Sequence, residues 1–197
     1  MTLFRLGLTG SIGMGKSTTV GFFRDEGIPV WDADAAVHRL YAAGGPAVGP
    51  LAALCPAALV EDGIDRAELR VWIASDPVAI AQIEKIVHPM VAADRARFLA
   101  ETSGDLVVCD IPLLFETGAA AQFDATLVIT APPELQRARV LARPGMTEES
   151  FRLILSRQMP DPEKRSRATH VIETLGLEAV RAAVQALIAY IRKTKDA

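Results

Sequence analysis

The sequence predicts an α/β fold with a five-stranded parallel sheet between layers of helices, a helical insertion and a helical lid. Three observations predict this architecture. Short apolar runs, typical of buried parallel strands, alternate with segments of helical periodicity. A glycine-rich loop joins the first of these runs to the first helical segment. Between residues 46 and 101 the strand-like runs stop, and helical segments separated by turn signals take their place.

The first elements are a strand over residues 3–9, a glycine loop and a helix. The loop fits the pattern G-x-x-x-x-G-K-[ST], in which backbone N–H groups and the helix dipole surround anionic oxygens. Its lysine can reach the β- and γ-phosphates, and its serine can ligate Mg²⁺. The expected phosphate-binding residues are Gly10, Gly13, Met14, Gly15, Lys16, Ser17 and Thr18. A glycine-rich turn that binds nothing is the alternative, but the flanking strand and helix favour a nucleoside triphosphate site.

The bulk composition limits the classes of function. The chain has 197 residues, 50% of them apolar, with a net charge of −3, so nothing in its composition suggests a general binder of nucleic acid or of anionic membranes, although a local basic patch stays open. Cys55 and Cys109 lack metal-ligand spacing, which favours buried thiols. We expect no signal peptide and no membrane span, because no apolar run approaches about 20 residues. A reducing cytoplasm is the simplest location.

A short second strand at Val30-Trp31 leads into two acids, Asp32 and Asp34. Ligands of open α/β sheets lie outside the carboxyl ends of the strands, so these carboxylates can serve a metal ion and a substrate hydroxyl. The plainer interpretation is that one of them only caps the helix expected over residues 35–43. The two roles are compatible.

The insertion, residues 46–103, has the place that a substrate-binding insertion takes in small kinases with such a loop. His88 lies within it, before a proline. By residue type alone, a single histidine is more often structural than a ligand contact.

The third strand, residues 106–110, is four apolar residues followed by Asp110. An acid at the carboxyl end of a buried strand beside a phosphate loop typically holds Mg²⁺, directly or through water. The next stretch, Pro112–Glu116, is a candidate for shaping the acceptor pocket, and Glu116 is equally consistent with a functional or a solvated role.

A fourth strand is expected over residues 125–130, and the segment 137–167 then carries eight Lys or Arg against four Asp or Glu. A helix, a turn at Arg143 and a second helix starting near Thr147 suggest a lid that closes on ATP. An exposed, salt-bridged helical face is the alternative. A short strand at 170–172 and a helix over 177–191 complete the chain. The expected domains are therefore a core of residues 1–45, 104–136 and 168–197, the insertion 46–103 and the lid 137–167.

Chains with this loop include switches, motors and small-molecule kinases. A GTPase of the switch type needs an Asn-Lys-x-Asp motif to recognise its base. This sequence contains no asparagine, which argues against that class. The remaining core is short for a motor or remodelling ATPase. Small size, the acid pair after the second strand and the basic lid favour phosphoryl transfer to a small acceptor.

The ordered motifs resemble the dephospho-coenzyme A kinase family. The resemblance runs from residue 7 to about 176 and includes Asp32-Ala33-Asp34, His88-Pro89 and Asp110–Glu116, together with Arg143 and Arg157-Gln158-Met159 before Lys164. It implies the three-layer fold of P-loop, nucleoside-monophosphate-kinase-like enzymes. It also implies Mg²⁺-dependent transfer of the ATP γ-phosphate to the ribose 3′-hydroxyl of dephospho-coenzyme A, giving coenzyme A and ADP.

The same resemblance implies a role for each matching residue. Asp34 would orient or deprotonate the acceptor hydroxyl, with Asp32 beside it near the metal ion, and Arg143 would offset charge on the transferring group. The implied roles group as follows: Asp34, Lys16 and Arg143 catalytic; Asp32, Asp34, His88 and Leu113 at the acceptor; Ser17, Asp32 and Asp110 at the metal.

The sequence departs from the family pattern in two places. It has Glu173–Gly176 where many members carry an asparagine, and Ile154 near the position of a lid arginine. Two other functions stay open: another small-molecule or nucleoside monophosphate kinase, and a nucleotide-binding module without turnover.

Overall fold

The computed structural model describes residues 3–195 and divides the chain into two units. We call residues 3–31 with 103–195 the sheet unit, and residues 32–102 the helical unit. Within the described residues, no helix combines the length and hydropathy needed to cross a bilayer.

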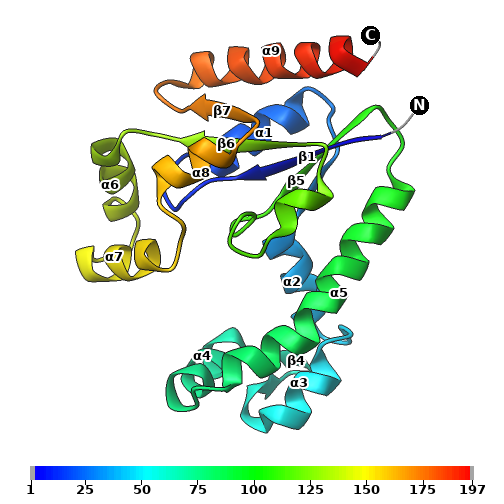
Figure 1. The fold of residues 1–197 in the computed structure, drawn as a ribbon. Helices are drawn as coiled ribbons and strands as arrows, with labels where there is room; N and C mark the ends of the chain where they lie inside the picture. Colours follow the sequence, from blue (N-terminus) through cyan, green and yellow to red (C-terminus); the bar gives the residue numbers. More distant parts are fainter. Residues whose placement is uncertain (1–2, 196–197) are drawn as a thin grey trace. The chain divides into compact units, whose positions relative to one another are not determined.

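The sheet unit is built on five strands in the order β2-β5-β1-β6-β7 (Figure 1). They are β1 (Phe4–Thr9), β2 (Val30–Asp32), β5 (Leu106–Asp110), β6 (Ala125–Thr130) and β7 (His170–Glu173). The pairs β1–β5, β1–β6 and β6–β7 run parallel, so the carboxyl ends of these strands meet at one edge. Every residue of β5 and β6 is buried, which explains their continuous apolar runs.

Helices cover the sheet and continue the chain between strands. In this unit they are α1 (Lys16–Asp25), α6 (Pro133–Leu141), α7 (Glu148–Ser156), α8 (Asp161–Arg167) and α9 (Leu177–Lys195), with a 3₁₀ turn η2 (Ala119–Gln122). α1 and α9 share one core with Leu6 and Leu8 of β1 (Figure 1). At Gly7, between those two leucines, a Cβ would come within 2.9 Å of the Phe123 ring, so glycine lets the connection after β5 pack against the sheet.

The helical unit has a separate core. Its elements are α2 (Ala33–Tyr41), α3 (Val48–Leu54), η1 (Pro56–Ala58), β3 (Leu59–Val60), β4 (Gly63–Ile64), α4 (Arg66–Ser75) and α5 (Ala79–Glu101). Leu40, Leu51 and Ile83 are among the buried residues that join α2, α3 and α5. The expectation of helices without strands in this stretch was wrong in one detail, because β3 and β4 pair as a small antiparallel hairpin.

α2 groups with the helical unit, whereas the sequence-based division placed it in the core with residues 1–45. The physical reason is its packing on α5. Arg39 of α2 donates to the Asp94 carboxylate at 2.6 Å, and Asp94 is 8% exposed. Arg97 also donates to Asp94, at 3.2 Å, so this buried carboxylate is paired within its own unit.

Candidate active site

The loop between β1 and α1 has the backbone shape that an anion site requires. Gly13 and Gly15 adopt φ of 77° and 88°, the left-handed region that other residues enter at a cost. Side chains are also excluded there, since a Cβ would lie 2.5 Å from Val140 at Gly13 and 3.0 Å from Thr174 Oγ1 at Gly15. Gly10 is required as well, because a Cβ there would lie 2.7 Å from the Ile129 carbonyl oxygen, so the packed loop needs all three glycines of the motif.

Residues far away in the sequence hold this loop in place. Gln136 Nε2 donates to the Ile12 carbonyl at 2.8 Å, and Ile12 N donates to Gln158 Oε1 at 3.1 Å. Thr174 Oγ1 donates to the Met14 carbonyl at 2.9 Å. Arg139 donates to both the hydroxyl and the carbonyl of Thr174, each at 2.8 Å. The predicted phosphate residue Met14 is itself buried, so its side chain belongs to the support of the loop.

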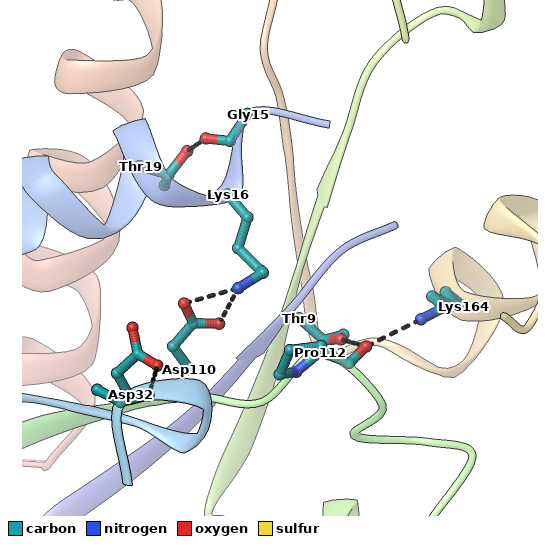
Figure 2. A network of polar contacts seen from close by, with 9 residues as sticks. Thr9, Gly15, Lys16, Thr19, Asp32, Asp110, Pro112 and Lys164 are labelled. Carbon is teal, nitrogen blue, oxygen red and sulfur yellow. Dashed lines mark hydrogen bonds and ion pairs between the residues drawn. The ribbon is translucent and has the colours of Figure 1, made fainter. Parts of the chain in front are cut away.

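Lys16 and Asp110 form an ion pair across the candidate site (Figure 2). Lys16 Nζ donates to both carboxylate oxygens, at 2.6 and 2.7 Å, and Asp110 is only 3% exposed. A buried carboxylate needs such compensation. The lysine expected on the phosphates thus neutralises the acid expected at the metal.

The start of α1 offers oxygen ligands of the kind that Mg²⁺ prefers. Ser17 and Thr18 are exposed there, and Asp110 supplies a carboxylate at the end of β5. Among residues 3–195 no group of three or more His, Cys, Asp or Glu side chains could hold a metal by itself. Mg²⁺ commonly binds one or two carboxylates plus substrate phosphates, so the donors present fit this ion in company with a nucleotide.

The connection after β5 is held by a buried lysine (Figure 2). Lys164 of α8, fully buried, pairs with Glu116 at 2.8 Å and donates to the Pro112 carbonyl at 3.4 Å. Thr9 Oγ1 donates to the same carbonyl at 3.0 Å, while Glu116 also accepts from Met159 N at 2.8 Å. Burial acts to raise the pKa of Glu116, but the hydrogen bonds from Lys164 and Met159 outweigh it and the pKa is lowered. Glu116 is therefore ionised and structural in this state.

Four arginines of the segment 137–167 fall into two groups. Arg137 pairs with Glu148 at 2.7 Å, and Arg139 supports Thr174, so both serve the structure in this state. Arg143, just beyond α6, and Arg157, at the end of α7, have exposed side chains. The helix expected near Thr147 is confirmed, since Thr147 Oγ1 accepts from Ser150 N at 3.1 Å and caps α7.

The remaining predicted residues are one partly buried acid, Asp32, and three exposed residues. Asp32 ends β2 and caps α2 by accepting from Ala35 N at 2.9 Å, so the capping interpretation is confirmed for this acid. Asp34 is exposed in the first turn of α2, and His88 is exposed on α5. Leu113, in the connection after β5, is 40% exposed.

Several residues that shape the loop carried no local signal in the sequence. Gln136 and Thr174 contact it only because α6 and the end of β7 fold back onto it. Lys164 and Gln158 stood out by the family resemblance alone, and the structure shows what each of them contacts. Paired long-range contacts of this kind have no short-range pattern to reveal them.

Comparisons with known proteins agree with one another. A family model described as dephospho-CoA kinase matches residues 4–177. A dephospho-CoA kinase of Cereibacter sphaeroides is 67% identical to this chain over 197 residues, and the match covers 100% of both chains. A second dephospho-CoA kinase, of Jannaschia sp., is 59% identical over 186 residues, and the match covers 94% of this chain and 95% of the relative. Among solved structures, a dephospho-CoA kinase from Campylobacter jejuni superposes with a TM-score of 0.73 at 25% identity, covering 98% of this chain and 100% of that one.

Proposed function

The chain belongs to the dephospho-CoA kinase family, and on that premise we propose which of its residues transfer the γ-phosphate of ATP to the ribose 3′-hydroxyl of dephospho-CoA. It is an ATP-dependent kinase with an α/β fold and a five-stranded sheet. The observation that carries the assignment of the site is the phosphate loop, with its left-handed glycines and with Lys16 bound to the buried Asp110.

Lys16 is the proposed ligand of the β- and γ-phosphates, together with the loop amides from Gly10 to Thr18. A triphosphate is a stronger anionic partner for Lys16 than one carboxylate, so binding of ATP would move the lysine off Asp110. The released carboxylate and the Ser17 hydroxyl would then hold Mg²⁺, with Asp32 contributing its second oxygen. When bound, the ion would neutralise charge on the phosphate oxygens.

Asp34 is the proposed group that receives the acceptor. It would orient the 3′-hydroxyl and take its proton while the hydroxyl oxygen forms a bond to the γ-phosphorus and the bond from that phosphorus to the bridging β-γ oxygen breaks. ADP leaves with the electron pair of the broken bond. Because such transfers have loose transition states, positioning contributes more than base strength. Exposure of Asp34 in the first turn of α2 supports the role.

Arg143 is the proposed lid residue that offsets charge on the transferring group. Its exposed side chain supports this choice over Arg137 and Arg139, which are bonded elsewhere. We also propose that residues 137–167 close on ATP as a lid, that His88 of the helical unit contacts the acceptor, and that Leu113 of the connection after β5 contacts it too. A cytoplasmic location completes the proposal, and the buried thiols of Cys55 and Cys109 support it.

A panel of acceptors tests the proposed reaction. Purified protein with Mg²⁺ and ATP is offered dephospho-CoA, shikimate or a nucleoside monophosphate, and ADP is measured in each case. We expect ADP formation to depend on dephospho-CoA. Faster turnover with another acceptor would assign the chain to a different small-molecule kinase activity, and ATP binding without transfer to any acceptor would leave a nucleotide-binding module.

A further inference from the structure

One peptide group of the phosphate loop is held on both sides by glutamine side chains. The Ile12 N–H donates to Gln158 Oε1 at 3.1 Å, and the Ile12 carbonyl accepts from Gln136 Nε2 at 2.8 Å. A backbone unit that is bonded through both its donor and its acceptor cannot rotate without losing one of the two bonds. The two glutamines therefore fix the direction of a peptide inside the motif that surrounds the phosphates.

The same two glutamines bracket the turn that carries the proposed lid arginine. Gln136 is a buried residue of α6, Gln158 is half-buried between α7 and α8, and Arg143 lies in the turn between α6 and α7 (Figure 1). Arg137 pairs with Glu148 at 2.7 Å, which joins α6 to α7. The chain thus leaves the loop peptide at one glutamine, passes through α6, the turn and α7, and returns to the same peptide at the other.

The residue after Gln158 contacts a second part of the site. Met159 N donates to Glu116 Oε1 at 2.8 Å, and Lys164 of α8 pairs with the same carboxylate at 2.8 Å. Glu116 lies in the connection after β5, the strand that ends at Asp110. Two consecutive residues therefore bond to the phosphate loop and to the connection that follows the acid of the proposed metal site, so the chain is fixed where it leaves α7.

We propose that Gln158 is a positioning residue for phosphoryl transfer, which holds α7 and the turn at Arg143 in a set place against the phosphate loop. The inference rests on the proposed function, because it takes the loop to bind the triphosphate of ATP and Arg143 to offset its charge. Gln158 acts through the Ile12 peptide and touches no reacting atom. Its contribution is preorganisation, since a charge that is already in place needs no rearrangement when ATP arrives.

A double-mutant cycle tests whether Gln158 acts through the lid arginine. Gln158→Met keeps the length of the side chain and removes the oxygen that accepts from Ile12 N. We expect ATP affinity, measured by calorimetry, and kcat/KM for ATP to fall about tenfold, as loss of one hydrogen bond allows, while the KM for dephospho-CoA stays the same. In a chain that already carries Arg143→Gln, the same substitution should change ATP affinity less than about twofold, because no lid charge is left to position.

Two further variants separate positioning from a loss of stability. Gln185→Met removes an exposed amide of α9 that donates to Glu26 at 2.7 Å, and it should match the wild type. Gln136→Met removes the other bond to the Ile12 peptide and should repeat the pattern of Gln158→Met. The thermal unfolding midpoint of Gln158→Met should stay close to that of the wild type, whereas hydrogen exchange of its Ile12 amide should be faster.

The ATP affinities of these variants decide on the proposal. Unchanged affinity in Gln158→Met would overturn it, and so would an equal loss of affinity with and without Arg143. A wild type that binds ATP but makes no CoA would overturn the proposed reaction alone, because the calorimetric cycle needs no acceptor and would still decide on Gln158.

Discussion

Asp34 is the residue on which the proposed chemistry depends most directly. Its carboxylate is exposed and lies in the first turn of α2, next to the acid that caps this helix. An exposed carboxylate contributes little to stability, so its replacement should affect catalysis and leave the fold intact.

The first prediction concerns Asp34→Asn. We expect kcat to fall at least about a hundredfold, because general-base and orienting contributions are typically of that size or larger. ATP binding, measured by calorimetry, should be unchanged. Glu84→Gln, which alters another exposed acid of the helical unit, serves as the control. Near-normal turnover of Asp34→Asn would remove this residue from the mechanism.

Glu116 and Lys164 illustrate a different role at the scale of single residues. Their ion pair joins the connection after β5 to α8, and the same carboxylate holds Met159. Because Lys164 is fully buried, its charge has no access to water when Glu116 is neutralised.

The second prediction is that Glu116→Gln destabilises the protein by about 3 to 5 kcal/mol at pH 7, the usual cost of leaving one partner of a buried pair. The folded-state pKa of Glu116 is lowered, so its stabilising effect is present above the ordinary glutamate range near 4.5 and is lost as pH falls below it. Urea unfolding at pH 7 and at lower pH measures the difference in the free energy of unfolding between the wild type and Glu116→Gln. The double variant Glu116→Gln with Lys164→Met should recover part of the loss, and a pH-independent difference would contradict the account.

At the scale of elements, the phosphate loop depends on neighbours that are distant in sequence. Gly15 lies against Thr174, and Thr174 is held by Arg139 of α6. The shape of the loop is therefore a property of β1, α1, α6 and the end of β7 together.

The third prediction compares Gly15→Ala with Gly21→Ala. At Gly15 the backbone has φ of 88° and a Cβ would meet Thr174, so we expect ATP binding to weaken at least about tenfold. At Gly21, inside α1, a Cβ meets nothing within 4 Å, and alanine should raise stability by about 1 kcal/mol. Calorimetric titration with ATP and thermal unfolding measure the two effects. Unchanged ATP affinity in Gly15→Ala would show that the loop tolerates another backbone shape.

The elements also show how far sequence reasoning extends. The continuous apolar runs at 106–110 and 125–130 predicted buried strands, and Thr147 predicted a helix start, because these signals are local. The β3–β4 hairpin was missed, since strands of two residues are too short to show a period. The burial of Lys164 could not be foreseen in an otherwise charged segment, because it depends on a partner remote in sequence.

At the scale of the whole molecule, the chain consists of two units with separate cores. The sheet unit contains the phosphate loop and Asp110, and the helical unit contains Asp34. The proposed reaction therefore assigns the phosphate donor to one unit and the acceptor to the other. Its central claim is that this chain transfers phosphate to dephospho-CoA through the lysine of its loop.

The most direct test of that claim measures ADP and CoA together from one reaction with Mg²⁺, ATP and dephospho-CoA. We predict that both products rise in equal amounts, that the new phosphate is on the ribose 3′-oxygen, and that Lys16→Ala abolishes both. Lys193→Ala, an exposed lysine of α9, should have no effect. ADP formed without CoA, or full activity in Lys16→Ala, would contradict the account.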